Sequence, residues 1–150
     1  MKLTISSPNN KIEGLNSQLS DGSPLILAID NDRDNLLLIN LVLSYLNYSL
    51  VMTANIQRAL SMVKRDRPDL ILLGINFPGI AEIEILRQLK QAASTRSIPI
   101  VALTAILNSD YLSYLSCLGC DYCLTKPYLL EDLEKLIGEL LSPTFSLIKD

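Results

Sequence analysis

The segment RPDLILLGINFPG, residues 67–79, decides the fold of this chain. Leu70 to Leu73 form a continuous apolar run that is too short for a helix and is bounded by Pro68 and Gly74. Such a run is typical of a strand buried on both faces. We expect this strand at the centre of a parallel sheet, where the loops that leave the carboxyl ends of the strands form the ligand crevice. The residue at that position is Gly74, which has no side chain.

The composition is that of a single globular domain. The chain has 150 residues, of which 49% are hydrophobic and 19% charged, enough for a sizeable core. A formal net charge of -3 disfavours a general binder of nucleic-acid phosphates. The first residues lack the apolar core of a signal peptide, and no apolar run reaches the ~18 residues that a membrane helix needs. We therefore expect a cytoplasmic protein that binds neither nucleic acid nor membranes.

Local composition divides the chain into three parts. Residues 1–23 are rich in Ser, Asn, Gly and Lys, which predicts a flexible N-terminal tail, and residues 142–150 are a short C-terminal tail. Residues 24–141 alternate strand and helix patterns, which predicts an α/β domain with a parallel sheet and helices on both faces. The expected strands are residues 25–29, 50–53, 70–73, 98–103 and 122–124, and the expected helices are residues 33–47, 56–63, 81–92, 109–118 and 130–141.

The first expected helix is apolar on two sides. One stripe would cover the sheet, while Leu37, Leu41, Tyr45 and Tyr48 form a second stripe on nearly the opposite side. A helix that is apolar all round is either buried or docked on something, although scattered exposed leucines are also common. The second stripe is therefore either ordinary surface or a contact surface for a partner or a second copy.

Polar residues follow the expected strands at their carboxyl ends. They are Asp30 and Asn31, Thr104, and Lys126 with Pro127. Together with RPDLILL, NFPG, IPIVALTA and LGCDYCLTKPY, this arrangement resembles the receiver domain of two-component response regulators over about residues 24–141. The resemblance implies a flavodoxin-like, doubly wound sheet of five parallel strands in the order 2-1-3-4-5.

The resemblance also implies roles for individual residues. In the family, an acidic pair holds Mg²⁺, an aspartate after the third strand accepts a phosphoryl group, and a Thr or Ser and a Lys contact that group. Asp30, Thr104 and Lys126 match the first acid, the hydroxyl and the lysine, and Pro127 matches a proline that follows a cis bond. Asn76 matches the position whose backbone carbonyl helps to hold the metal.

Three residues depart from the family pattern. They are Gly74 in place of the phosphoacceptor, Asn31 in place of the second acid, and Cys123 in place of the usual aromatic. Because glycine offers no oxygen nucleophile, no acyl phosphate can form there. With Asp30 nearly alone as a carboxylate, we expect Mg²⁺ binding to be weak or absent and no other cofactor.

Loss of the phosphoacceptor leaves Lys126 without its usual partner. We expect Lys126 to pair with Asp30 across the emptied pocket, since a semi-buried unpaired charge is costly. An alternative is that the vacated pocket holds an anion or small ligand between Thr104 and Lys126.

Other residues of the second half allow two interpretations each. Tyr111 and Tyr114, on the fourth expected helix, lie on a face that receivers often use to meet partners, whereas we expect Tyr128 in the core. Cys117, Cys120 and Cys123 have the spacing C-x2-C-x2-C, but without a fourth cysteine or a histidine they are expected to be small buried side chains rather than iron-sulfur ligands.

Two functions from different classes follow. The first is a stand-alone pseudo-receiver that is not an enzyme and acts by contact with another signalling protein, such as a histidine kinase or regulator, or with a second copy. The second is a haloacid-dehalogenase-like phosphatase, in which Asp30 would be the nucleophile and Asp32 the acid and base, because D-x-D after an apolar strand also matches that class. The missing metal-binding acids and the receiver-like motifs favour the first.

Overall fold

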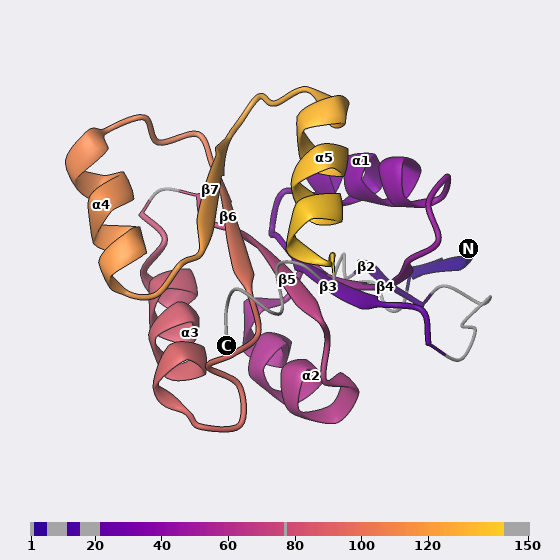
Figure 1. Ribbon diagram of the computed structural model, residues 1–150, viewed down its shortest axis with the longest axis horizontal. Coiled ribbons are helices and arrows are strands. Elements are labelled where there is room, and N and C mark those ends of the chain that lie inside the picture. Colours follow the sequence, from indigo (N-terminus) through magenta and orange to yellow (C-terminus); the bar gives the residue numbers. More distant parts are fainter. Residues whose placement is uncertain (1, 6–11, 16–21, 77, 143–150) are drawn as a thin grey trace.

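The computed structural model describes residues 2–5, 12–15, 22–76 and 78–142. Strands and helices alternate from residue 25 onward, as the pattern of apolar residues predicts (Figure 1). The strands are β1 (Lys2–Ile5), β2 (Ile12–Leu15), β3 (Leu25–Ile29), β4 (Ser49–Thr53), β5 (Leu70–Gly74), β6 (Ile100–Thr104) and β7 (Tyr122–Thr125). The helices are α1 (Arg33–Leu43), the short 3-10 helix η1 (Ile56–Arg58), α2 (Ala59–Asp66), α3 (Ile80–Gln91), α4 (Ser109–Cys117) and α5 (Leu130–Leu140).

The predicted parallel sheet is confirmed. Within the described residues the sheet has seven strands in the order β1-β2-β4-β3-β5-β6-β7, and its last five strands are parallel neighbours. Numbered among themselves, these five strands have the flavodoxin-like order 2-1-3-4-5. β5 lies between β3 and β6 and is buried along its whole length, as expected for a continuous apolar run at the centre of such a sheet.

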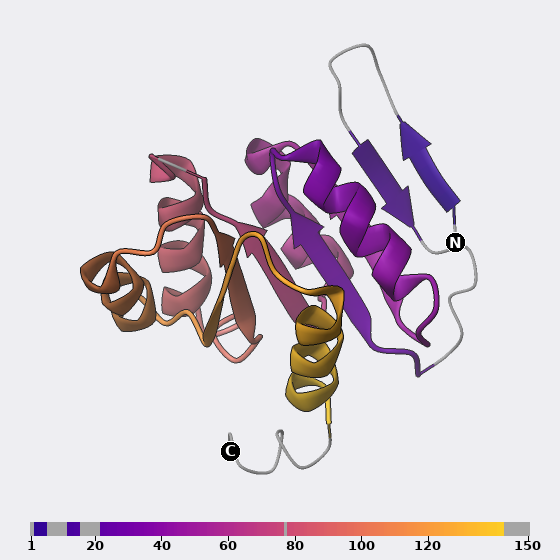
Figure 2. The same cartoon turned by 90° about the horizontal axis from the view of Figure 1, so that it is seen from above.

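The predicted flexible tail over residues 1–23 is wrong where the structure describes it. β1 and β2 pair antiparallel, and β2 also pairs antiparallel with β4, so this hairpin extends the parallel sheet (Figure 2). The hairpin satisfies backbone groups that β4 would otherwise expose as an edge strand. The other residues of the predicted tails, 1, 6–11, 16–21 and 143–150, lie outside the described residues.

Two layers of helices enclose the sheet. α1 and α5 lie side by side on one face, where Leu36, Ile39, Leu133 and Ile137 join the apolar side chains of the strands (Figure 1). α2, α3 and α4 cover the other face and contribute a second buried cluster. The central strands send alternate side chains into both clusters, so their positions are determined from two sides.

Element ends differ from the prediction by a few residues for local reasons. α1 ends at Leu43 rather than at residue 47, because the chain continues in a turn after the Ser44 N–H group bonds the Asn40 carbonyl. The expected helix 56–63 is split into η1 and α2, and the side chain of Asn55 caps the first of these. None of the helices in the described ranges is long and apolar enough to cross a membrane.

Candidate functional site

The carboxyl ends of the parallel strands bring the predicted site residues to one edge of the sheet. Ile29 of β3 pairs in register with Leu73 of β5, so Asp30 lies beside Gly74. Gly74 pairs in register with Leu103 of β6, so Thr104 follows directly at the same edge. Lys126 comes next after β7, and its N–H group bonds the Thr104 carbonyl at 2.8 Å. The expected constellation is therefore present in space.

Asp30 is the centre of a buried polar cluster. Its side chain is buried, and its two carboxylate oxygens accept four hydrogen bonds from nitrogen donors. The donors are Asn35 Nδ2 at 2.8 Å, Lys126 Nζ at 2.8 Å, the backbone N–H of Asp32 at 2.9 Å and Asn76 Nδ2 at 3.0 Å. This carboxylate is thus satisfied by the protein itself.

The predicted pairing of Lys126 with Asp30 is confirmed. The Lys126 side chain is only 12% exposed, and besides Asp30 its ammonium group donates to Asn76 Oδ1 at 3.3 Å. The carboxylate of Asp32 lies 3.7 Å away and adds a weaker attraction. The peptide bond between Lys126 and Pro127 is cis, as the resemblance implies. The lysine therefore has an anionic partner inside the folded domain.

Gly74 is necessary for this arrangement. A Cβ atom added to Gly74 would overlap the Cγ and both carboxylate oxygens of Asp30. The carboxylate of Asp30 therefore fills the space directly above Gly74. The alternative of an anion or small ligand held between Thr104 and Lys126 stays a prediction, and such a ligand would have to share this edge with the Asp30 carboxylate.

The other two predicted residues lie at the edge of the cluster. Thr104 is fully buried, and its hydroxyl oxygen accepts a hydrogen bond from the Ile106 N–H group at 3.2 Å. Asn31 is exposed, and its Oδ1 atom accepts from Asn76 Nδ2 at 2.6 Å. Asn76 thus acts through its side chain, which links Asp30, Asn31 and Lys126.

Two residues of the cluster were not predicted as part of the site. Asn35 is buried on α1 and bridges Asp30 to Tyr128, whose hydroxyl donates to Asn35 Oδ1. Burial raises the pKa of Tyr128 to about 12, and the negative charge of Asp30 adds to this shift. The sequence signal for Asn35 was its position four residues before Ile39. Residues four apart share one face of a helix, and Ile39 faces the sheet.

An open pocket of about 570 Å³ lies beside the cluster. The residues that line it include Asp32, Asp34, Lys126 and Tyr128. Asp32 also caps α1, since its side chain accepts from the Asn35 N–H group. The opening is therefore lined by both signs of charge.

Some of the predicted contact residues are exposed and others are half-buried. Leu37 and Leu41 of α1 are exposed by 46% and 49%, and Tyr45, in the turn that follows α1, is exposed by 82%, as predicted for the second stripe. Tyr48 departs from this prediction because it is half-buried and packs against the core beneath α1 and α5.

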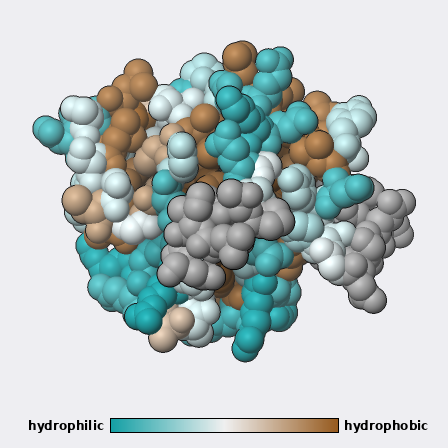
Figure 3. Space-filling view, viewed as in Figure 1, coloured by the Kyte–Doolittle hydropathy of each residue, from teal (hydrophilic) through white to brown (hydrophobic). Residues whose placement is uncertain are grey.

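On α4, the two tyrosines differ in the same way. Tyr114 is exposed and accepts a hydrogen bond from Arg87, whereas Tyr111 is half-buried against the core on its face of the sheet. Burial raises the pKa of Tyr111. Figure 3 shows apolar surface over the loop that leads into α4, which carries the exposed Leu107, and over α1, with the polar surface of α5 between them.

The three cysteines differ in burial. No cluster of three or more His, Cys, Asp or Glu residues that could hold a metal is present among the described residues. Cys120 is buried and Cys123 half-buried, with their sulfur atoms 4.0 Å apart, but Cys117 is exposed, contrary to the expectation that all three are buried. The helix end that carries Cys117 turns it toward solvent.

The fold and the edge cluster define the class of phosphorelay-type receiver domains with a flavodoxin-like sheet. The family described as response regulator receiver domain matches residues 26–138. This chain belongs to that family of two-component signalling domains. The comparisons match the receiver family and give no support to a haloacid-dehalogenase-like phosphatase.

Relatives and solved structures agree with this assignment. The response regulator MprA of Mycobacterium leprae is 37% identical over 120 residues, which are 79% of this chain and 51% of MprA. The chain thus matches about half the length of that relative. Sporulation initiation phosphotransferase F of Bacillus subtilis is 29% identical over 77% of this chain and 92% of its own length. The crystal structure of a two-component response regulator from Clostridium difficile has a TM-score of 0.74 and 25% identity, covering 81% of this chain and 98% of that one.

Proposed function

We propose that this receiver domain is a pseudo-receiver, which is not phosphorylated at the usual position and signals by contact with another protein. The observation that carries the proposal is the position of Asp30. Its carboxylate fills the space beside Gly74 and forms an ion pair of 2.8 Å with Lys126. The edge of the sheet where phosphoryl transfer would take place is therefore closed by the protein's own charges.

Phosphoryl transfer to this edge lacks a nucleophile at the family position. Transfer requires an oxygen atom in line with the leaving group, and Gly74 supplies none. Asp30 is a poor substitute, because both its oxygens already accept hydrogen bonds and one of them holds the Lys126 ammonium. An attack by Asp30 would require the buried ion pair to separate first.

Magnesium should bind weakly here for the same reason. Mg²⁺ demands near-ideal octahedral oxygen geometry and is usually held through one or two carboxylates. The side chain of Asn31 is uncharged, and a metal ion at Asp30 would have to displace the ammonium of Lys126, leaving that cation nearly buried. The donor set of this chain therefore does not fit the ion well.

The stripe on α1 is the surface that we assign to a partner. Leu37 and Leu41 are four residues apart, so they lie on one side of α1, and Tyr45 continues this exposed surface in the turn after the helix. Tyr114 offers a second, smaller contact on α4. The partner would be a histidine kinase, another regulator or a second copy of this chain, and no catalytic step is required of the domain.

Incubation with a small phosphodonor and Mg²⁺, followed by intact-mass measurement, tests the proposal. We expect no species heavier by one phosphoryl group, while a phosphorylatable receiver treated in parallel gains that mass. A phosphorylated species would contradict the proposal. If that species persisted in Asp30→Asn and Asp32→Asn, the acceptor would lie outside this acidic cluster.

A further inference from the structure

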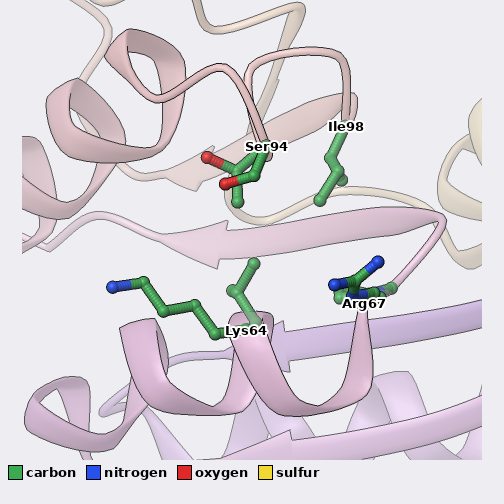
Figure 4. A pocket seen from close by; sticks show the side chains of 7 residues that line it. Lys64, Arg67, Ser94 and Ile98 are labelled. Atoms are coloured by element: carbon green, nitrogen blue, oxygen red, sulfur yellow. The ribbon is translucent and has the colours of Figure 1, made fainter.

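A second pocket lies at the opposite end of the sheet from Asp30. It has a volume of about 210 Å³ and lies between the end of α2 and the loop that joins α3 to β6. Figure 4 shows that its labelled side chains come from both walls, with Lys64 and Arg67 on the α2 side and Ser94 and Ile98 on the loop side. No part of the edge cluster reaches this pocket.

The pocket combines an apolar lining with two cationic side chains. Val63 and Pro68 are buried, and Ile98 is half-buried, so they form an apolar floor and wall. Lys64 and Arg67 are exposed, and Figure 4 shows them on the α2 side of the pocket with their charged ends pointing in different directions. The lining thus suits a ligand that has an apolar part and an anionic part.

Among the residues that the structure describes, no carboxylate pairs with either cation. Neither Lys64 nor Arg67 contacts a carboxylate within the described part of the chain, whereas Arg65 between them pairs with Asp66 at 2.8 Å. The carboxyl end of α2 contributes about half a negative charge, which offsets only a fraction of the two positive charges. The pocket is therefore a positive site on a chain whose net charge is -3.

Arg67 is held in an unusual backbone conformation. Its φ of 49° lies in the left-handed region, which glycine or asparagine adopts with less strain than arginine. This conformation ends α2, where the Arg67 N–H group bonds the Val63 carbonyl at 2.9 Å, and it places Arg67 at the pocket directly after the helix. Its planar guanidinium can donate two parallel hydrogen bonds to a phosphate or carboxylate group.

We propose that this pocket binds a small organic phosphate monoester. The Arg67 guanidinium can bind the phosphate directly, the Lys64 ammonium on the same side of the pocket adds positive charge, the Ser94 hydroxyl adds a hydrogen-bonding group, and the apolar lining receives the organic part. The volume is below the ~300 Å³ at which pockets for drug-sized ligands begin, so the organic part is short. The proposal is independent of phosphorylation at the other end of the sheet.

Phenyl phosphate is a suitable probe, and the matched controls are in the chain itself. Titration of the full chain at constant ionic strength, followed by backbone amide shifts, should show saturable binding confined to residues 63–68 and 92–98. Arg67→Asn removes the charge while tolerating the left-handed backbone, and it should weaken binding by about tenfold or more, as should Lys64→Gln. Arg65→Gln removes a charge from the same helix and should change affinity less than about twofold.

Further ligands separate the two parts of the proposed site. Phenol, which lacks the phosphate, should bind far more weakly than phenyl phosphate, and inorganic phosphate should also bind more weakly because it leaves the apolar lining unused. Equal weakening by Arg65→Gln and Arg67→Asn would reveal a general charge effect and overturn the proposal. Absence of saturable binding, or shifts centred on Asp30 and Lys126, would overturn it as well.

Discussion

A Cβ atom added to Gly74 would overlap the carboxylate of Asp30. The side chain that follows β3 has therefore taken the space that a side chain at the end of β5 would need. The glycine at position 74 and the ion pair with Lys126 are therefore linked. Because Gly74 has no side chain, the carboxylate of Asp30 has room to lie beside it while it binds the Lys126 ammonium. It also makes the site sensitive to small changes of volume.

Gly74→Ala should destabilise the fold by about 1–3 kcal/mol, because the added methyl group must push Asp30 out of its hydrogen bonds. Gly138→Ala is the matched control, since a Cβ there meets nothing within 4 Å and the residue lies in helix α5. That control should stabilise the fold by about 0.5–1 kcal/mol. Urea unfolding of both variants measures the difference, and a neutral Gly74→Ala would mean that Asp30 moves aside freely.

Asp30→Asn should lower the free energy of unfolding by about 3–5 kcal/mol, because it leaves the ammonium of Lys126 nearly buried without its main anion. The double variant Asp30→Asn with Lys126→Met should lose less than the sum of the two single changes, since neither charge remains. Arg65→Gln breaks an exposed pair and should cost less than about 1 kcal/mol. Strict additivity in this double-mutant cycle would show that the pair is not coupled.

Tyr128 should titrate about two pH units later than an ordinary tyrosine, with a pKa of about 12, because burial and the charge of Asp30 disfavour its phenolate. A folded pKa raised above the unfolded value of about 10 contributes stability below pH 10, and this contribution is lost as the pH rises through 12. Ultraviolet titration of tyrosine absorbance measures the pKa. Tyr128→Phe should remove the late transition and cost about 0.5–1.5 kcal/mol through the lost hydrogen bond to Asn35. An unchanged titration curve in that variant would refute the assignment.

Cys117 should react first with a thiol reagent, because it is exposed, while Cys120 should react last. The hydrogen bond with Cys123, together with burial, raises the pKa of Cys120, and the same hydrogen bond lowers the pKa of Cys123. Absorbance of the released thiolate should therefore show a fast first equivalent. Cys117→Ser should abolish that phase and leave the slower ones, and a persistent fast phase in this variant would contradict the burial of the other two thiols.

Leu41→Asp should disrupt partner binding without unfolding the domain, because Leu41 lies in the exposed stripe of α1. Ile80→Asp is the control, since Ile80 is also an exposed apolar residue but begins α3, on the other face of the sheet. Sedimentation of the purified chain, and binding assays with candidate histidine kinases, measure the effect. Equal binding by wild type and Leu41→Asp, with loss only in Ile80→Asp, would move the contact surface to α3.

Much of this architecture could be predicted from local patterns. The apolar runs of β3 and β6 are short and end in polar residues, and the short run of β5 ends at Gly74. The alternation of strands and helices then leaves few topologies for a parallel sheet. The pairing of Lys126 with Asp30 followed from the cost of an unpaired buried charge. The hairpin of β1 and β2 was missed, since short polar strands at a sheet edge resemble the composition of a tail.

The contacts of Asn35, Tyr128 and Asn76 could not be derived in the same way. Their hydrogen bonds join residues up to 93 positions apart, and such distances in sequence leave the partner open until the chain has folded. Tyr48 and Tyr111 illustrate a related limit. Helical periodicity places them on an outer face, but the packing of neighbouring elements decides how much of each ring is covered.

The amino acids by themselves determined that position 74 has no nucleophile, because this is a property of glycine in any fold. They also determined the alternation of strands and helices, which follows from the periods of 2 and 3.6 residues in the apolar pattern. Only the tertiary structure decided that the carboxylate of Asp30 lies in the space left by Gly74. Which group enters a vacated space depends on strand register, side-chain rotamers and competing hydrogen bonds, and these exist only once the strands have come together.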